Sequence, residues 1–273
     1  MDQFSELLPI ILVMAVIGGF SGVIAGLLGV GGGIVLVPAF YFALGAMNFH
    51  SDQLMQVCVA TSLATIIITS IRSASGHNKR GAVDWTVIKT WAPGLLVGAF
   101  LGAIVAQFVS SDVLLFVFGA LGTVIGIYMA SGKNWRLAEA MPVGPLRAAL
   151  SSLLSFVSVL MGIGGGTFGV PLMSLFGFPI HKAVGTGSAF GVLIAVPSVI
   201  VFLLADIDPA AAPPYTVGAV NIPAFLLVIA VSLITTPWGV KLAHAMNPGP
   251  LKRVFGIFLT LTALNMLRKA LGW

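Results

Sequence analysis

Ten apolar runs follow one another through almost the whole chain. Most are about 20 residues long, the length that an α-helix needs to cross the hydrocarbon core of a bilayer. Helices are the economical form for ten separate segments in lipid, because each helix satisfies its own backbone hydrogen bonds. We therefore expect an all-α polytopic membrane protein with about ten transmembrane segments, at 7–28, 33–47, 57–75, 86–109, 112–131, 147–163, 167–179, 183–204, 219–240 and 251–270.

Few charged side chains interrupt or separate these runs. Charged residues make up 8% of the 273-residue chain, whereas roughly 25% is usual for a soluble domain. A soluble fold of this size could not cover its surface with so few charges, which excludes a soluble enzyme and a soluble binding module. The net charge of +5 does not indicate nucleic-acid binding, because the basic residues are scattered singly between the runs.

The distribution of basic residues predicts the orientation of the segments. If the N-terminus lies outside, the loops near 76–84, 132–146, 180–182 and 241–250 face the cytoplasm. These loops and their flanks then hold most of the basic residues, as the positive-inside rule requires. We expect both termini outside the cytoplasm, and 11 of the 13 Lys and Arg residues inside it, namely Arg72, Lys79, Arg80, Lys89, Lys133, Arg136, Arg147, Lys182, Lys241, Lys252 and Arg253.

An internal repeat divides the chain into two halves. A Gly-x-Gly-Gly-Gly-x4-Pro element occurs at 29–38 and again at 162–171. Each half holds five runs, an odd number, so the second half must enter the membrane from the opposite side. The sequence thus predicts two inverted repeats, 1–132 and 147–273, joined by a cytoplasmic linker at 133–146, a symmetry that many secondary transporters use. Further matches pair Ala60-Thr61-Ser62 with Gly185-Thr186-Gly187-Ser188, Gly81-Ala82-Val83-Asp84 with Gly218-Ala219-Val220-Asn221, and Val117-Phe118-Gly119 with Val254-Phe255-Gly256.

The two glycine clusters are the sharpest candidates for a binding site. A glycine run exposes backbone N–H groups, and a short helix that starts there directs its positive dipole end at a ligand. Short, glycine-interrupted segments at matching places in two halves mark transporter binding sites. The alternative is close helix packing, which we favour for the separate stripe of Gly18, Gly22 and Gly26. The candidate anion-binding glycines are Gly31, Gly32, Gly33, Gly164, Gly165 and Gly166.

Hydroxyl side chains in the first turns of runs three and eight are further candidates. Thr61, Ser62, Thr186 and Ser188 lie at matching places in the repeats and could donate to anionic oxygens. The alternative for each is a hydrogen bond to the carbonyl one turn back in its own helix. Arg72 is the charge deepest in an apolar run and could attract an anion, although snorkelling to the interface is the plainer interpretation.

No residue pattern predicts a cofactor or a metal site. The four histidines, His50, His77, His181 and His244, are all expected in loops, and no two have metal-ligand spacing on one helix. No Asp or Glu lies at the centre of a run, where proton pumps and most cation carriers place a carboxylate. No Gly-x4-Gly-Lys-Ser/Thr loop is present, so we do not expect ATP to drive the protein directly. The sequence also lacks a Ser/His pair or an Asp pair for intramembrane proteolysis, and we expect no enzymatic activity.

Taken together, these motifs resemble the TauE/SafE family, the sulfite exporter or toluenesulfonate uptake permeases. The resemblance rests on the duplicated glycine–proline element, the two Thr-containing segments and the Gly-x-Val-Asp/Asn start of the following helix, and it covers nearly the whole chain. Gly187, an apparent insertion between Thr186 and Ser188, departs from the pattern. The resemblance implies a multi-pass permease of the inner (plasma) membrane that carries sulfur-containing anions such as sulfite or sulfonates.

The leading hypothesis is a secondary transporter that exports such an anion, bound near the membrane midplane between the two halves. Expelling one negative charge from an inside-negative cell releases about 2.3 kcal/mol per 100 mV, so export needs no coupling carboxylate. An anion channel with the same site and a non-transporting membrane scaffold are the alternatives. The expected partners are the small anion and the lipid bilayer, with no nucleic acid, and a homodimer is left open.

Overall fold

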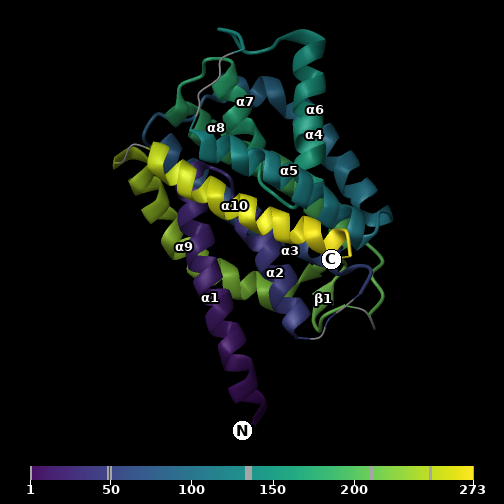
Figure 1. Cartoon of the computed structure of the whole chain (residues 1–273). Coiled ribbons are helices and arrows are strands. Elements are labelled where there is room, and N and C mark those ends of the chain that lie inside the picture. The colour runs from purple at the N-terminus through teal and green to yellow at the C-terminus, as the bar shows by residue number, and fades with distance from the viewer. Residues whose placement is uncertain are drawn as a thin grey trace.

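The chain folds into a bundle of helices, shown in Figure 1. The computed structural model describes residues 2–47, 49, 51–132, 137–209, 212–245 and 248–272. Within them it contains ten helices and one two-stranded antiparallel hairpin. The elements are α1 (Asp2–Leu28), α2 (Gly33–Ala46), α3 (Leu54–Asn78), α4 (Trp85–Phe108), α5 (Ser111–Ser131), α6 (Gly144–Leu160), α7 (Gly166–Leu175), α8 (Ile180–Leu203), β1 (Thr216–Val217), β2 (Val220–Asn221), α9 (Ile222–Ala245) and α10 (Pro248–Ala270).

The lengths of the helices follow the apolar runs. Among the described residues, six helices are long and apolar enough to cross a membrane, namely α1, α3, α4, α5, α8 and α9. The two helices that follow the glycine clusters are short, with 14 residues in α2 and 10 in α7. The prediction of an all-α polytopic membrane protein with two short, glycine-led segments is confirmed.

Side-chain caps fix where α4 and α9 begin. The carboxylate of Asp84 accepts hydrogen bonds from the backbone N–H groups of Thr86 and Val87. Asn221, its match in the repeat, accepts from the N–H of Ala224 and also ties down the β1–β2 hairpin through Thr216. Such caps satisfy N–H groups that have no partner inside the helix. The hairpin itself was not expected, because its second strand lies at the start of a predicted apolar run.

The helices α3 and α8 form the centre of the bundle. In α3, 83% of the apolar window is buried, and in α8 61%, against 39–50% in the other four long helices. The pair packs side by side, and α9 covers α3 while α4 covers α8. Figure 1 shows α10 lying along α5 at the front of the bundle. The most buried helices therefore come from both halves of the chain.

Glycine stripes let two pairs of helices approach closely. A Cβ atom on Gly18 or Gly22 of α1 would lie 2.8 Å from the backbone of α9, so the predicted packing role of that stripe is confirmed. On α4, Gly98 and Gly102 face α6 in the same way: a Cβ atom on Gly98 would collide with the carbonyl oxygen of Ser152, and one on Gly102 would lie 2.8 Å from that of Phe156. Without a hydrophobic driving force between helices in lipid, such close contact supplies much of the attraction.

The helix packing corresponds between the two halves. Numbered by the sequence repeat, α1–α5 match α6–α10. The contact of α1 with α9 then has its counterpart in that of α6 with α4, and the contact of α3 with α9 in that of α8 with α4. The short helices pack likewise, α2 on α3 and α7 on α8.

The prediction that the histidines fall in loops is wrong for three of them. His77 lies in the last turn of α3, His244 in the last turn of α9 and His181 in the first turn of α8. Polar residues can extend a helix past its apolar run, and here the ends of α3 and α9 do so. His50 and residues 133–136 of the predicted linker lie outside the described residues.

Candidate functional site

The two glycine clusters meet at the centre of the molecule. We call residues 29–33 and 162–166 the glycine crossing; all ten are buried. A Cβ atom on Gly33 would lie 2.8 Å from Cα of Ile163, and one on Gly166 would lie 3.0 Å from Cα of Val30. Each cluster thus packs directly on the backbone of the other, and a larger residue at either contact would force them apart.

The backbone of the first cluster also requires glycine for its conformation. Gly31 and Gly32 have φ angles of 74° and 85°, in the left-handed region that residues with a Cβ atom rarely adopt. This turn ends α1 and starts α2 at Gly33, while the second cluster starts α7 at Gly166. Two short helices therefore begin at the crossing, one from each half of the chain.

The crossing presents backbone N–H groups that have no hydrogen-bond partner among the described residues. In the described chain, none of the six candidate glycines donates its amide hydrogen to another residue, as expected at the first turn of a helix. The partial positive charge of both helix dipoles adds to these donors. The arrangement suits a compact anion, and the residues concerned are Gly31, Gly32, Gly33, Gly164, Gly165 and Gly166.

The predicted threonines link the two halves in a reciprocal way. The hydroxyl oxygen of Thr61 accepts a hydrogen bond from the N–H of Asn221 at 2.9 Å, and that of Thr186 accepts from the N–H of Asp84 at 3.0 Å. Both threonines are buried. Within the described residues neither hydroxyl donates to the carbonyl one turn back, so each retains its proton for another acceptor.

The two predicted serines use their protons within the protein. Ser62 donates to the carbonyl of Gly162 at 2.8 Å and so holds the second glycine cluster in place. Ser188 donates to the carbonyl of Val184 one turn back, as the alternative interpretation expects, and its Oγ lies 2.9 Å from Oγ of Ser73. These contacts give both serines a structural role.

Three buried hydroxyls that sequence reasoning did not single out have no hydrogen-bond partner among the described residues. Ser70 lies beside Gly31, since a Cβ atom on that glycine would come within 3.2 Å of its Oγ. Thr167 follows Gly166 in the first turn of α7. The backbone carbonyl of Ser158 accepts a hydrogen bond from the N–H of Ile163, but its hydroxyl has no partner in the described chain. Unpaired buried hydroxyls are costly, and the sequence offers no signal for them, because pairing depends on neighbours distant in the chain.

Arg72 is not part of the glycine crossing. Its side chain is exposed on α3, whereas every residue of the glycine crossing is buried. Among the described residues no group of three or more His, Cys, Asp or Glu side chains is arranged to hold a metal ion.

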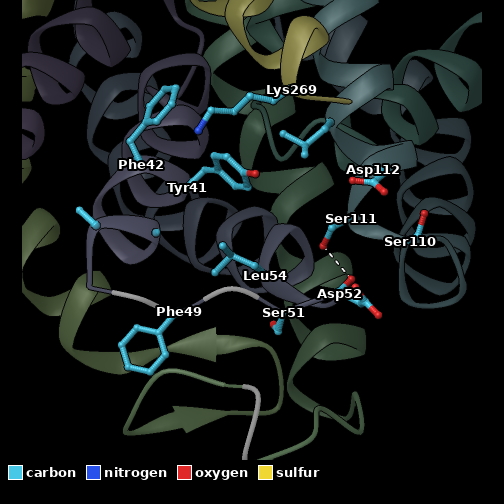
Figure 2. A pocket seen from close by; sticks show the side chains of 13 residues that line it. Tyr41, Phe42, Phe49, Ser51, Asp52, Leu54, Ser110, Ser111, Asp112 and Lys269 are labelled. Atoms are coloured by element: carbon cyan, nitrogen blue, oxygen red, sulfur yellow. Dashed lines mark hydrogen bonds between the residues drawn. The ribbon is translucent and has the colours of Figure 1, made fainter. Parts of the chain in front are cut away.

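A separate cavity of about 460 Å³ lies at the other end of α2 from the glycine crossing. Figure 2 shows Lys269 reaching over the rings of Tyr41 and Phe42, with its Nζ 5.1 Å and 4.7 Å from the two ring centres. Asp52 and Asp112 line the same cavity, which contains none of the predicted site residues. Because two carboxylates and one ammonium group line this cavity, its charges do not favour an anionic ligand.

Comparison with known proteins agrees with these observations. Residues 14–266 match the family described as sulfite exporter TauE/SafE. A probable membrane transporter protein of Haemophilus influenzae is 29% identical over 95% of this chain and 98% of its own length. A probable membrane transporter protein of Methanocaldococcus jannaschii is 26% identical over 97% of each chain. No solved structure matches. With nearly its whole length matched, the chain belongs to the sulfite exporter TauE/SafE family.

Proposed function

We propose that the protein is a secondary transporter of the plasma membrane that exports a small sulfur-containing oxyanion, bound at the glycine crossing. The observation that carries this proposal is the set of unpaired amide hydrogens at the meeting point of two short helices. The names of the relatives, both called probable membrane transporter proteins, support transport rather than catalysis.

The chemistry of the donors fits such an anion. Sulfite and sulfonate present several oxygens on one small centre, and the amides, with Ser70 beside Gly31 and Thr167 next to Gly166, supply uncharged donors at the crossing. The hydroxyls of Thr61 and Thr186 keep a free proton one residue away from Ser62 and Gly187, which contact the second glycine cluster. Hydrogen bonds to an ionised group are about twice as strong as neutral ones. A site without a buried cation holds an anion loosely enough to release it on the other side.

The movement that transport requires would come from the two halves of the chain. Each glycine cluster packs on the backbone of the other in this structure, so the anion binds when the halves separate at the crossing. The correspondence of packing between α1–α5 and α6–α10 supports two oppositely inserted repeats. Rocking one such half against the other would expose the site to each side of the membrane in turn.

Export needs no second ion. The membrane potential releases about 2.3 kcal/mol per negative charge and 100 mV, which sustains a gradient of about 50-fold for a monovalent anion. This accords with the absence of an acidic residue from the centre of any apolar run.

Counterflow of labelled sulfite or sulfonate in proteoliposomes tests the proposal, with two alanine variants on the same helix as a matched pair. In Gly33→Ala the new Cβ lies 2.5 Å from the carbonyl oxygen of Gly162 in the opposite cluster, whereas in Gly45→Ala nothing lies within 4 Å. We expect Gly33→Ala to lose transport and Gly45→Ala to keep it, with both proteins folded. Equal rates would contradict the site, flux that never saturates would indicate a channel, and no flux of any oxyanion would indicate a scaffold.

A further inference from the structure

Three histidines from three helices gather at one end of the bundle. Nδ1 of His77 lies 3.0 Å from Nε2 of His244, and their ring centres are 5.2 Å apart. His181 stacks on His244 at 5.7 Å between ring centres. His77 is almost fully buried, with 1% of its surface exposed. The proposed transport site uses none of these residues.

The hydrogen bonds of His77 fix how many protons the pair can hold. Its Nε2 lies 2.8 Å from the carbonyl oxygen of Gly26 on α1, and a carbonyl only accepts, so Nε2 carries a proton. In neutral His77, Nδ1 is then the acceptor, and Nε2 of His244 donates to it. The pair can accept one added proton on Nδ1 of His244, the ring nitrogen that does not contact His77. A second added proton would bind Nδ1 of His77, so that two N–H groups would point at each other and the hydrogen bond between the rings would break.

The surroundings of the pair are positively charged. Arg80, in the turn after α3, donates to the carbonyl of Val240 at 2.9 Å, one turn before His244 on α9. The groups that face the pair are Arg80, His181 from α8 and, from α1, the carbonyl of Gly26. Asp84 is turned to the start of α4, which it caps. Lys182 and Lys241, next to the histidines on α8 and α9, are exposed. Each added proton therefore meets repulsion.

In the described part of the chain, the repeat places no titratable side chain at the two positions that match His77 and His244. The N–H of Ala82 donates to the carbonyl of His77, and the N–H of Ala219 donates to that of Phe202, so Phe202 holds the matching position. Gln107 matches His244, since each is the last residue but one of a 24-residue helix, and its amide lies 3.4 Å from the carbonyl of Val201 on α8. Among the described residues, the positions that match the His77–His244 pair therefore hold no histidine.

We propose that the His77–His244 pair is a proton-binding site that holds the ends of α3 and α9 together at one end of the bundle and releases them from each other when both histidines are protonated. Its role in transport rests on the proposed function, in which release of these helix ends opens one face of the site. The proton-dependent separation itself does not depend on transport.

Distances between spin labels test this inference without any substrate. Labels at Lys79→Cys and Lys241→Cys, in a Cys58→Ser background, report the ends of α3 and α9; labels at Leu204→Cys and Phe108→Cys report the opposite end. Because burial and the neighbouring positive charges oppose protonation of the pair, the pH must fall well below the usual histidine range. At pH of about 3, against about 7.5, we expect both histidines to gain protons and the first distance to lengthen reversibly by more than the width of its distribution at neutral pH. The second distance should stay unchanged.

A variant at each histidine makes the result specific. His244→Gln keeps a donor for His77 and copies the side chain of the opposite end, and it should abolish the response to pH. If it does not fold, His77→Gln serves the same purpose, because its amide can still donate to Gly26. An unchanged distance in the wild type, or a response that survives in the variant, would overturn the inference. A failed transport assay would leave these distances unaffected.

Discussion

Replacing Thr167 by valine separates a binding role from a structural one. The hydroxyl of Thr167 is buried, with 1% of the residue exposed, and has no partner among the described residues. Valine has nearly the same shape and lacks the hydroxyl. A structural threonine would lose stability on this change, whereas an unpaired hydroxyl kept for a ligand should not.

The two expected effects have opposite signs. An unsatisfied buried polar group costs about 1–3 kcal/mol, so Thr167→Val should leave the free energy of unfolding unchanged or raise it by about 1 kcal/mol. A hydrogen bond to a charged group contributes about 1.5–3 kcal/mol. The same variant should therefore bind the anion about 10- to 100-fold more weakly.

Thermal unfolding of the purified protein measures both effects, because a ligand that binds the folded state raises Tm with its concentration. Sulfite and a sulfonate are titrated against wild type, Thr167→Val and Thr167→Ser, the last of which restores a hydroxyl. We expect Thr167→Val to have an equal or higher Tm without anion and a weaker rise with anion. A lower Tm without anion, together with an unchanged rise, would refute the reasoning.

Three further predictions concern packing, capping and the link between halves. Gly22→Ala places a Cβ 2.8 Å from the backbone of α9 and should destabilise the protein by about 1–3 kcal/mol, whereas Gly19→Ala, with its nearest neighbour a side chain at 3.4 Å, should change stability by less than about 0.5 kcal/mol; equal Tm values would contradict this. Asp84→Ala should lose about 1 kcal/mol by uncapping α4, and Asp84→Asn should restore most of it in denaturant unfolding. Thr61→Val and Thr186→Val each remove one of the two matching acceptors and should lower Tm by similar amounts; a shift in only one would show that the two links are not equivalent.

The sequence predicts the helices well because the bilayer sets their length. A run of about 20 apolar residues has few alternatives to a spanning helix, and the short helices after the glycine clusters followed from the same reasoning. The histidines were misplaced because polar residues at the end of a run do not show whether the helix continues. His77 lies in the last turn of α3 for this reason.

The site was predictable only in part. The repeat identified Thr61 and Thr186, since matching positions in two halves stand out in one sequence. Their partners Asn221 and Asp84 lie 160 and 102 residues away, and no local pattern pairs them. The unpaired state of Ser70 and Thr167 likewise depends on what surrounds each hydroxyl in the folded chain.

Selective labelling of glycine amides tests the central claim most directly. Glycine labelled with ¹³C at the carbonyl and ¹⁵N at the amide gives a correlated signal only where one glycine follows another. In this sequence those amides belong to Gly19, in the stripe on α1, and to Gly32, Gly33, Gly165 and Gly166 of the glycine crossing. We predict that sulfite or a sulfonate shifts the four signals of the crossing to saturation and leaves that of Gly19 in place. Four unmoved signals under an anion that raises Tm would place its binding site elsewhere and contradict the account.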